Sequence, residues 1–395
     1  MAPTTRRAAI IAAARTAIGT ARKGTLANMT ATELAKPVVL AAIERSGRDV
    51  DDFDDLILGE VMQGGGDIAR YVAADLGLTG IPGMAVNRQC ATSLSAIAAA
   101  AGQIAAGMSE ALLAGGTESL STAPMCRKRR PFMTGENPAD YDDPWFSFSH
   151  PQTAEAPAMD MSITVAHNCA VQYGVSRQDQ DEWALRSHQR AVKAIDSGSF
   201  VDEIVPIAVP QPDGSTKLFA VDEHPRRETT IDVLAALKVL HPEIEGFTVT
   251  AGNSSGLNDA AAVVALAAPD SPNSLANVLA WASVGIAPKE TGSGPIKAIP
   301  KALERAGLRL SDVALFEINE AFAAQAVACS RALGLDEDIV NVYGSGISLG
   351  HPIAATGARM VTSAIYELRR RGGGIGVLSM CAGGGMGAAI VIEVN

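Results

Sequence analysis

The chain has 395 residues; 47% are hydrophobic, only 4% are aromatic, and 38 are glycine. This length exceeds the usual single core, and the Ala- and Gly-rich composition excludes a disordered chain and favours an α/β enzyme over a β-sandwich. With 32 basic and 43 acidic residues, the net charge of -11 also excludes bulk nucleic acid and anionic membrane surfaces as expected partners.

The first residues predict a buried strand, and the cysteines predict no structural framework. Apolar residues 8–14 are too few for a membrane span, which needs about 20 residues. The five cysteines are widely spaced and form no Cys-x-x-Cys pair, so neither disulfides nor a zinc site is indicated and we expect no metal. A reducing cytoplasm fits this pattern best.

The first half of the chain carries a helix that begins next to Cys90. Apolar or small residues follow in steps of three and four, which marks one face of a helix, at Leu94, Ile97, Ala101, Ile104 and Met108. A short buried strand from 111 to 114 comes next, and Gly115-Gly116 is expected to end it.

The middle of the chain, residues 121–246, differs in character. It holds most of the aromatic residues, many prolines and the basic run from Arg127 to Arg130, so we interpret it as an inserted loop domain. Its one strongly helical stretch, residues 176–195, begins with Ser176 and Asp179 in positions that suit an N-terminal cap.

The second half repeats the layout of the first. A helix is predicted from His351 onward, with its apolar face at Ala354, Ala358, Val361, Ile365 and Leu368. Basic residues 369–371 and Gly372 suit its C-terminus. A strand from 375 to 380 follows and leads into Cys381 and a glycine run. The sequence therefore predicts a duplicated α/β unit, and the alternating pattern predicts parallel strands covered by helices.

Cys90 and His351 are the first candidates for chemistry, because each lies at a predicted helix start. Backbone N–H groups and the helix dipole there favour a thiolate at Cys90, although most free cysteines are simply small buried hydrophobes. His351 has the pKa range of a base near neutral pH, but a histidine beside Pro352 also suits a turn.

Two further candidates lie where strands end. Cys381 and its glycines would let a ligand approach backbone N–H donors, while the plainer interpretation is a glycine turn. Asn319 follows the apolar strand 313–318, at the edge where open α/β sheets bind ligands; as an alternative, Asn319-Glu320 is a helix cap.

Six motifs occur in order along the chain: residues 87–91 around Cys90, 251–256, 281–285, 319–322, 350–352 and 381–385. Together they resemble the signatures of the thiolase family over essentially the whole chain. The resemblance implies an α/β fold with duplicated βαβαβαββ halves in five layers, α-β-α-β-α. It places the N-terminal half at 1–120 plus 247–272, a CoA-binding loop domain at 121–246 and the C-terminal half at 273–395.

The resemblance also implies a division of labour among the candidates. Cys90 is the acyl-accepting nucleophile, His351 activates it, and Cys381 moves the proton at the α-carbon. One oxyanion site is assigned to His351 and a water held by Asn319, and the other to the backbone N–H groups of Cys90 and Gly383. Claisen condensation or thiolysis of a 3-ketoacyl-CoA would then proceed through an acyl-cysteine.

Coenzyme A and acyl-CoA are, by the same resemblance, substrates, and no tightly bound cofactor is expected. Contacts with them are expected at Arg226, Ser255, Met159, Ala321 and Phe322. The family further implies a homodimer or a homotetramer. Physiological direction is open, since a catalyst does not set an equilibrium.

Three departures from the family pattern leave the acyl-chain preference open. Ala158-Met159-Asp160 replaces His-Met-Gly, Ser254 replaces an alanine, and Asp67-Ile68 replaces Gln-Asn. Two other functions compete with a thiolase. A ketosynthase-like condensing enzyme would carry a second histidine where this chain has Cys381, and a non-catalytic CoA- or lipid-binding member of the fold would need none of the reactive residues.

Overall fold

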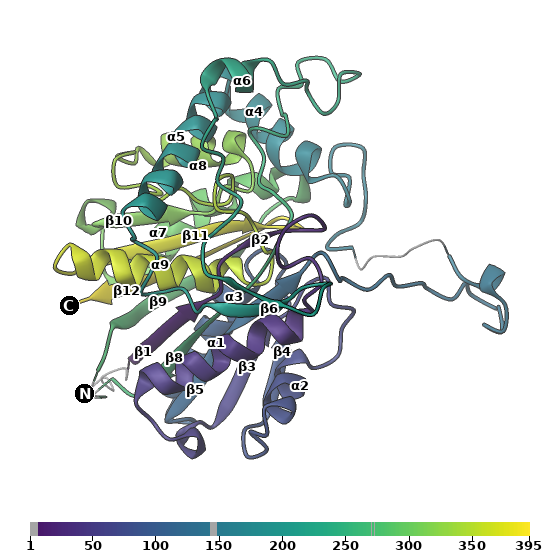
Figure 1. The fold of residues 1–395 in the computed structure, drawn as a ribbon. Coiled ribbons are helices and arrows are strands. Elements are labelled where there is room, and N and C mark those ends of the chain that lie inside the picture. The colour runs from purple at the N-terminus through teal and green to yellow at the C-terminus, as the bar shows by residue number, and fades with distance from the viewer. Residues whose placement is uncertain (1–6, 143–147, 270, 272) are drawn as a thin grey trace.

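The computed structural model describes residues 7–142, 148–269, 271 and 273–395. Two halves, each with its own group of strands, are stacked through shared helices, and a middle segment lies over them (Figure 1). The strands are β1 (Ala8–Arg15), β2 (Gly19–Thr20), β3 (Asp55–Gly59), β4 (Gly83–Val86), β5 (Ala111–Ser119), β6 (Ile207–Pro210), β7 (Thr216–Phe219), β8 (Asn258–Ala267), β9 (Ala276–Gly285), β10 (Leu315–Ile318), β11 (Gly374–Ala382) and β12 (Met386–Val394). The α-helices are α1 (Ala31–Ser46), α2 (Ile68–Asp75), α3 (Thr92–Ala105), α4 (Asn168–Tyr173), α5 (Arg177–Asp196), α6 (Ile231–Ala235), α7 (Gly294–Ala306), α8 (Ala323–Leu333) and α9 (Thr356–Arg370).

The main strands form one hydrogen-bonded series in the order β10-β11-β12-β9-β1-β8-β5-β3-β4, with β2 beside β8. The two halves meet where β1 pairs with β9 over a short register, Ala8–Ile10 against Ala276–Val278. The expectation of parallel strands is only partly right. Strand pairs β3–β4, β3–β5 and β10–β11 are parallel, whereas β1, β8, β9 and β12 pair antiparallel with their neighbours.

The five expected layers are confirmed by the three main apolar clusters. Helices α1 and α2 pack on the outer face of the N-terminal strands, around Leu34, Val38 and Val72. In the centre, α3 and α9 lie between the two groups of strands, so that Ile97 and Ile365 share one core with Val264 and Ile390. Helices α7 and α8 cover the outer face of the C-terminal strands.

Two sequence expectations about the first half were wrong. Strand β5 does not end at Gly115-Gly116 but runs on to Ser119. A Cβ at Gly115 would lie 2.0 Å from the Ala262 carbonyl oxygen, and one at Gly116 2.0 Å from that of Ala354. These glycines allow close packing in a strand and do not turn the chain. Met108 lies beyond the end of α3 and is 78% exposed, so it is not part of the buried helix face.

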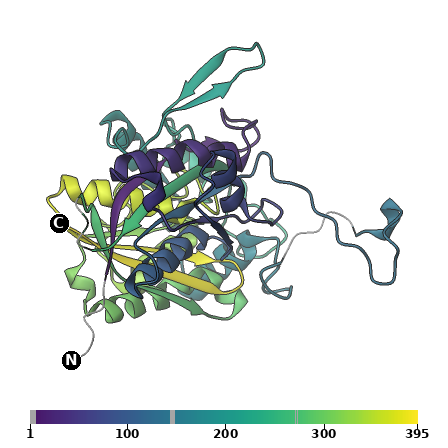
Figure 2. The same ribbon diagram turned by 90° about the horizontal axis from the view of Figure 1, so that it is seen from below.

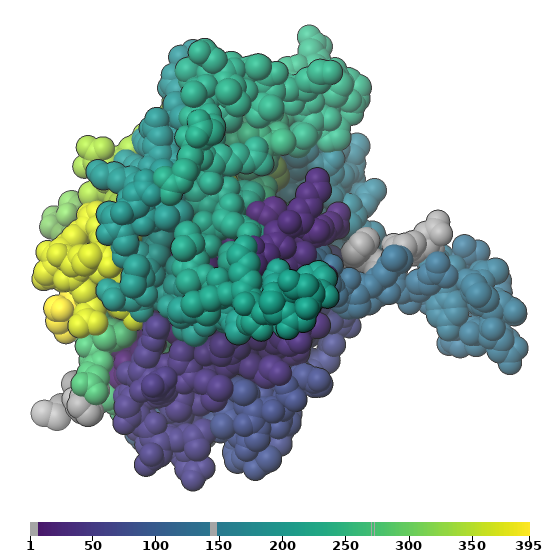
Figure 3. Space-filling view, viewed as in Figure 1, coloured from purple at the N-terminus to yellow at the C-terminus, as the bar shows by residue number. Residues whose placement is uncertain are grey.

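The middle segment contributes α4, α5 and α6, a β6–β7 hairpin that projects from the body (Figure 2) and an arm on the right of Figure 1. Its teal residues cover much of the face between the two halves (Figure 3). The predicted cap of α5 is confirmed: Ser176 and Asp179 form a reciprocal capping box. No helix in the described part of the chain combines the length and apolarity that a bilayer span requires.

Candidate active site

The four candidate residues all lie at or near the ends of elements. Cys90 lies between β4 and α3, and the preceding Gln89 has a left-handed φ of 49°. His351 lies in the loop before α9, Asn319 directly follows β10, and Cys381 is the penultimate residue of β11. Because β10 and β11 are parallel neighbours, Asn319 and Cys381 leave the same edge of the C-terminal strands.

Cys90 is partly exposed and receives two backbone hydrogen bonds at sulfur, from the N–H of Gly383 and from its own N–H. Burial of the thiol nevertheless raises its pKa to about 11, against the effect of these donors. The expectation that the helix start favours a thiolate is therefore opposed by burial, which has the larger effect on the pKa. Helix α3 begins only at Thr92, and desolvation of the charged form outweighs the N–H groups.

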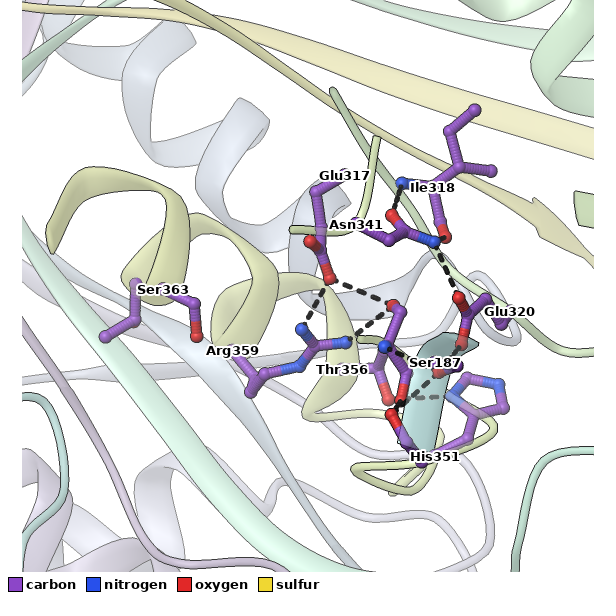
Figure 4. A network of polar contacts seen from close by, with 12 residues as sticks. Ser187, Glu317, Ile318, Glu320, Asn341, His351, Thr356, Arg359 and Ser363 are labelled. Atoms are coloured by element: carbon purple, nitrogen blue, oxygen red, sulfur yellow. Dashed lines mark hydrogen bonds and ion pairs between the residues drawn. The ribbon is translucent and has the colours of Figure 1, made fainter. Parts of the chain in front are cut away.

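The His351 side chain is buried and its tautomer is fixed by Thr356 (Figure 4). Its Nδ1 lies 2.7 Å from the Thr356 hydroxyl oxygen, and that hydroxyl donates to the Pro352 carbonyl at 2.9 Å. With the single hydroxyl proton directed to Pro352, Nδ1–H donates to the hydroxyl oxygen and Nε2 carries the lone pair. Among the described residues, Nε2 has no hydrogen-bond partner.

Burial, and then the charge of Arg359, lower the pKa of His351 to about 3. The imidazole is thus neutral near pH 7 and can accept a proton at Nε2. His351 does not stand at the first residue of a helix, as the sequence suggested. It precedes a turn in which the backbone N–H of Thr356 donates to the Pro352 carbonyl at 2.9 Å, and α9 begins at Thr356.

The Asn319 side chain is fully buried, yet within the described residues neither its amide nitrogen nor its amide oxygen has a hydrogen-bond partner. An orphaned buried amide is costly, so this group is available to a ligand or water. It is not a helix cap, because α8 begins at Ala323 and Phe322 occupies its N-cap position.

Cys381 is buried in a small apolar cluster with Val165, Ala321, Met161 and Phe322. Burial first, and the neighbouring Cys90 second, raise the pKa of the Cys381 thiol well above its usual range. The following glycines form the turn between β11 and β12, with φ of 94° at Gly384 and 78° at Gly385. The glycine-turn interpretation and a role at the site are therefore compatible.

Met159, an expected substrate contact, lies outside the apolar cluster around Cys381. Its side chain is 54% exposed, whereas Met161 packs against the Cys381 cluster. Residues Ser162–His167 form a π-helix, which has more residues per turn than an α-helix and commonly occurs at functional sites. Sequence periodicity of 3.6 residues gives no sign of such a turn.

A cavity of about 210 Å³ opens between the middle segment and the residues before β8. Arg226 lines it, and so do His188, His224 and Ile347. Ser254 lines this cavity, while Ser255 does not; the backbone N–H of Ser255 instead donates to the Ala321 carbonyl at 3.0 Å. The cavity wall is thus bonded to the segment that covers Cys381.

Thr356 and Glu118 are two further residues near the site that the sequence analysis missed. The Glu118 carboxylate accepts hydrogen bonds from Met62, Gln63 and the backbone N–H of Ala354, and burial raises its pKa to about 7. A hydroxyl five residues after His351 was the only available signal for Thr356.

No group of three or more His, Cys, Asp or Glu side chains in the described ranges could hold a metal ion.

Comparisons with known proteins cover nearly the whole chain. Residues 8–270 match the family "Thiolase, N-terminal domain" and residues 272–394 match "Thiolase, C-terminal domain". The chain is 40% identical to 3-ketoacyl-CoA thiolase of Bacillus subtilis, over 98% of this chain and 100% of the relative. It is 41% identical to beta-ketoadipyl-CoA thiolase of Acinetobacter baylyi, over 98% and 99%.

Solved structures agree. The acetyl-CoA acetyltransferase of Bacillus anthracis superposes with a TM-score of 0.90 at 40% identity, covering 99% of both chains. Human mitochondrial 3-ketoacyl-CoA thiolase in complex with CoA superposes with a TM-score of 0.89 at 37% identity, over 99% of this chain and 98% of that one.

Proposed function

The chain belongs to the thiolase family and is an acyltransferase, and on this premise we propose that it carries the acyl group on Cys90. In the cleaving direction, Cys90 Sγ attacks the 3-carbonyl carbon of a 3-ketoacyl-CoA and its proton moves to His351 Nε2. The C2–C3 bond breaks, and the electron pair remains on C2 as the enolate of acetyl-CoA. That enolate takes a proton from the Cys381 thiol, which leaves an acyl-Cys90 and a Cys381 thiolate.

The second half-reaction restores the enzyme. Cys381 takes the proton of the incoming CoA thiol, whose sulfur attacks the acyl-Cys90 carbonyl. The C–S bond to Cys90 breaks, and the departing sulfur takes its proton back from His351. Run backward, the same steps condense two molecules of acetyl-CoA into acetoacetyl-CoA and release one free CoA.

The observation that carries this proposal is the fixed tautomer of His351. With Nδ1–H donated to Thr356, only Nε2 is free to accept the Cys90 proton. Because burial raises the pKa of Cys90 and lowers that of His351, we propose that the proton moves from sulfur to nitrogen as the substrate is attacked.

We propose two sites for the negative charge that develops on thioester oxygens. The backbone N–H groups of Cys90 and Gly383 converge on the Cys90 sulfur and would donate to the oxygen of its acyl group. The orphaned amide of Asn319, with a water, and His351 would serve the other oxygen. Removal of one such donor typically costs about 3 kcal/mol of barrier.

Coenzyme A and acyl-CoA are the proposed substrates, and the loop domain 121–246 is proposed to hold the CoA moiety. The cavity beside Arg226 and Ser254 suits pantetheine, with the Arg226 guanidinium toward the phosphates. Ala321 and Phe322 lie between this cavity and Cys381. We further propose a homodimer or homotetramer in the cytoplasm, where five free thiols would remain reduced.

Steady-state thiolysis tests the proposal. Acetoacetyl-CoA and CoA should give two molecules of acetyl-CoA, and a series of longer 3-ketoacyl-CoA substrates should define the chain preference. Absence of thiolysis with every chain length would overturn the proposed reaction. Condensation from an acyl-carrier substrate alone would favour a ketosynthase-like enzyme instead.

A further inference from the structure

Glu320 is a buried carboxylate whose hydrogen bonds all come from neutral donors. It is 1% exposed, and no Lys, Arg or His forms an ion pair with it in the described part of the chain. Its Oε1 accepts from Trp183 Nε1 at 2.9 Å and Asn341 Nδ2 at 3.0 Å. Its Oε2 accepts from Ser187 Oγ at 2.6 Å and the Ile347 backbone N–H at 3.3 Å. Four donors on one buried carboxylate hold it in a single orientation.

The four donors belong to two separate elements, and Figure 4 shows one donor from each, Ser187 and Asn341, beside Glu320. Trp183 and Ser187 lie on α5, in the middle segment, while Asn341 and Ile347 lie in the loop between α8 and His351. Glu320 therefore joins α5 to the loop that delivers the proposed base.

On the α5 side, the link reaches the proposed CoA cavity. His188 follows Ser187, lines the cavity and accepts the Arg226 backbone N–H at 3.2 Å. Ile347 lines the same cavity, and its carbonyl accepts a hydrogen bond from His224. Ile347 thus lines the cavity, and its backbone N–H donates to Glu320.

On the catalytic side, the link reaches Asn319 and His351. Asn319 is the chain neighbour of Glu320. The loop packs closely against both residues at Gly346, where a Cβ would lie 2.5 Å from the Glu320 carbonyl oxygen and 2.7 Å from Asn319 Oδ1. The Ser187 and Ser348 hydroxyls lie 2.7 Å apart, and Ser348 lies three residues before His351. Between Ser348 and His351, the backbone N–H groups of Leu349 and Gly350 donate to the Ser345 and Gly346 carbonyls at 2.7 and 3.2 Å, so hydrogen bonds continue along the loop to the proposed base.

We infer that Glu320 is a positioning residue, which fixes Asn319 and His351 relative to CoA bound against α5. This inference rests on the proposed function, because it presumes that His351 and Asn319 act on a CoA thioester. A displacement of about 1 Å between reacting groups can lower a rate by about 100-fold, so the effect should fall on kcat.

The test compares Glu320→Gln with wild type in acetoacetyl-CoA thiolysis, with rates expressed per acetylatable Cys90. The amide keeps the shape but turns an NH2 group toward donors. We expect kcat per active site to fall by about 10- to 100-fold, while the KM for CoA changes by less than about 3-fold. Glu337→Gln, which removes the exposed partner of Arg186 near the same helix, should leave kcat unchanged within about 2-fold.

Two other results would overturn the inference. In the first, kcat per acetylatable Cys90 is unchanged and only the fraction of chains that can be acetylated falls, which would make Glu320 merely structural. In the second, the KM for CoA rises at unchanged kcat, which would make Glu320 a CoA contact. If Glu320→Gln does not fold, Trp183→Phe and Ser187→Ala each remove one donor and should lower kcat by about 5-fold. Wild-type kcat in both would contradict the positioning role. Failure of wild type to acetylate Cys90 would instead refute the proposed function.

Discussion

The turn before α3 and the turn before α9 occupy corresponding places in the two halves, yet they treat their reactive residues differently. Cys90 remains partly exposed, and the donors to its sulfur in the described part of the chain are backbone N–H groups, those of Gly383 and of Cys90 itself. His351 is buried, and its ring is held by the Thr356 side chain. Helices α3 and α9 then pack together, with the Ala358 backbone N–H donating to Ser93 Oγ at 2.9 Å.

This difference separates two requirements of the chemistry. A nucleophile must be reached by a large substrate, and the Cys90 residue accordingly keeps part of its surface exposed. A base must present one nitrogen at one place, so its turn encloses the ring and fixes the tautomer. A duplicated framework thus supplies equivalent positions, and local side chains assign them different tasks.

Replacement of the second thiol, Cys381→Ser, should have the largest effect. Cys90 and His351 stay in place and a CoA thiolate can leave unprotonated, so acetyl-CoA should still acetylate Cys90, with a smaller loss of rate than condensation shows. Condensation should fall by at least about 1,000-fold, because the α-carbon loses its proton acceptor. Rapid-quench measurement of the two half-reactions checks this; equal loss of both would contradict the separate roles.

Thr356→Val should come next. The change preserves the shape but leaves Nδ1 without its acceptor, so Nε2 is no longer the only basic nitrogen. We expect kcat to fall by about 100-fold. This is less than the loss of about 10,000-fold that follows when a serine protease loses the carboxylate that fixes its histidine tautomer. Thr356→Ser keeps the hydroxyl and should retain kcat within about 5-fold. Similar activity in the two variants would remove the tautomer argument.

Acid should lower the free energy of unfolding, because two buried histidines resist protonation in the folded chain. Burial lowers the pKa of His351 to about 3 and that of His188 to about 4, against 6.5 for an ordinary histidine. Between these values the unfolded chain binds more protons than the folded one, so the free energy of unfolding should decrease as pH falls below 6.5. By about pH 4.5, the lowered pKa of each histidine should reduce the free energy of unfolding by on the order of 2 to 3 kcal/mol.

Urea unfolding from pH 7.5 to 4.5 measures this slope, and His351→Asn should make it shallower. An identical slope in that variant would show that His351 is not held neutral by the fold.

The smallest expected effect concerns the contact between the two turns. Ser93→Ala would leave the buried Ala358 N–H without its acceptor and should lower the free energy of unfolding by about 1 to 2 kcal/mol. Ser95→Ala is a matched control on the same helix, since its hydroxyl bonds only to the Ala91 carbonyl of its own helix start. Equal denaturant midpoints for the two variants would argue against a contribution from this contact.

The positions of the reactive residues could be predicted from sequence because helix starts, strand ends and motifs are local features. Their protonation could not, because it depends on distant parts of the chain. The Cys90 sulfur meets the N–H of Gly383, and the cluster around Cys381 includes Val165 of the middle segment. Similarly, Gly116 looked like the end of a strand, since nothing in the sequence shows that the Ala354 backbone packs against it.

The central claim is that the acyl group passes through Cys90, and intact-mass analysis after incubation with acetyl-CoA tests it most directly. We predict one acetyl group per chain, which peptide mapping locates on the peptide containing Cys90 and free CoA removes. Acetylation of another residue, or none at all, would contradict the account.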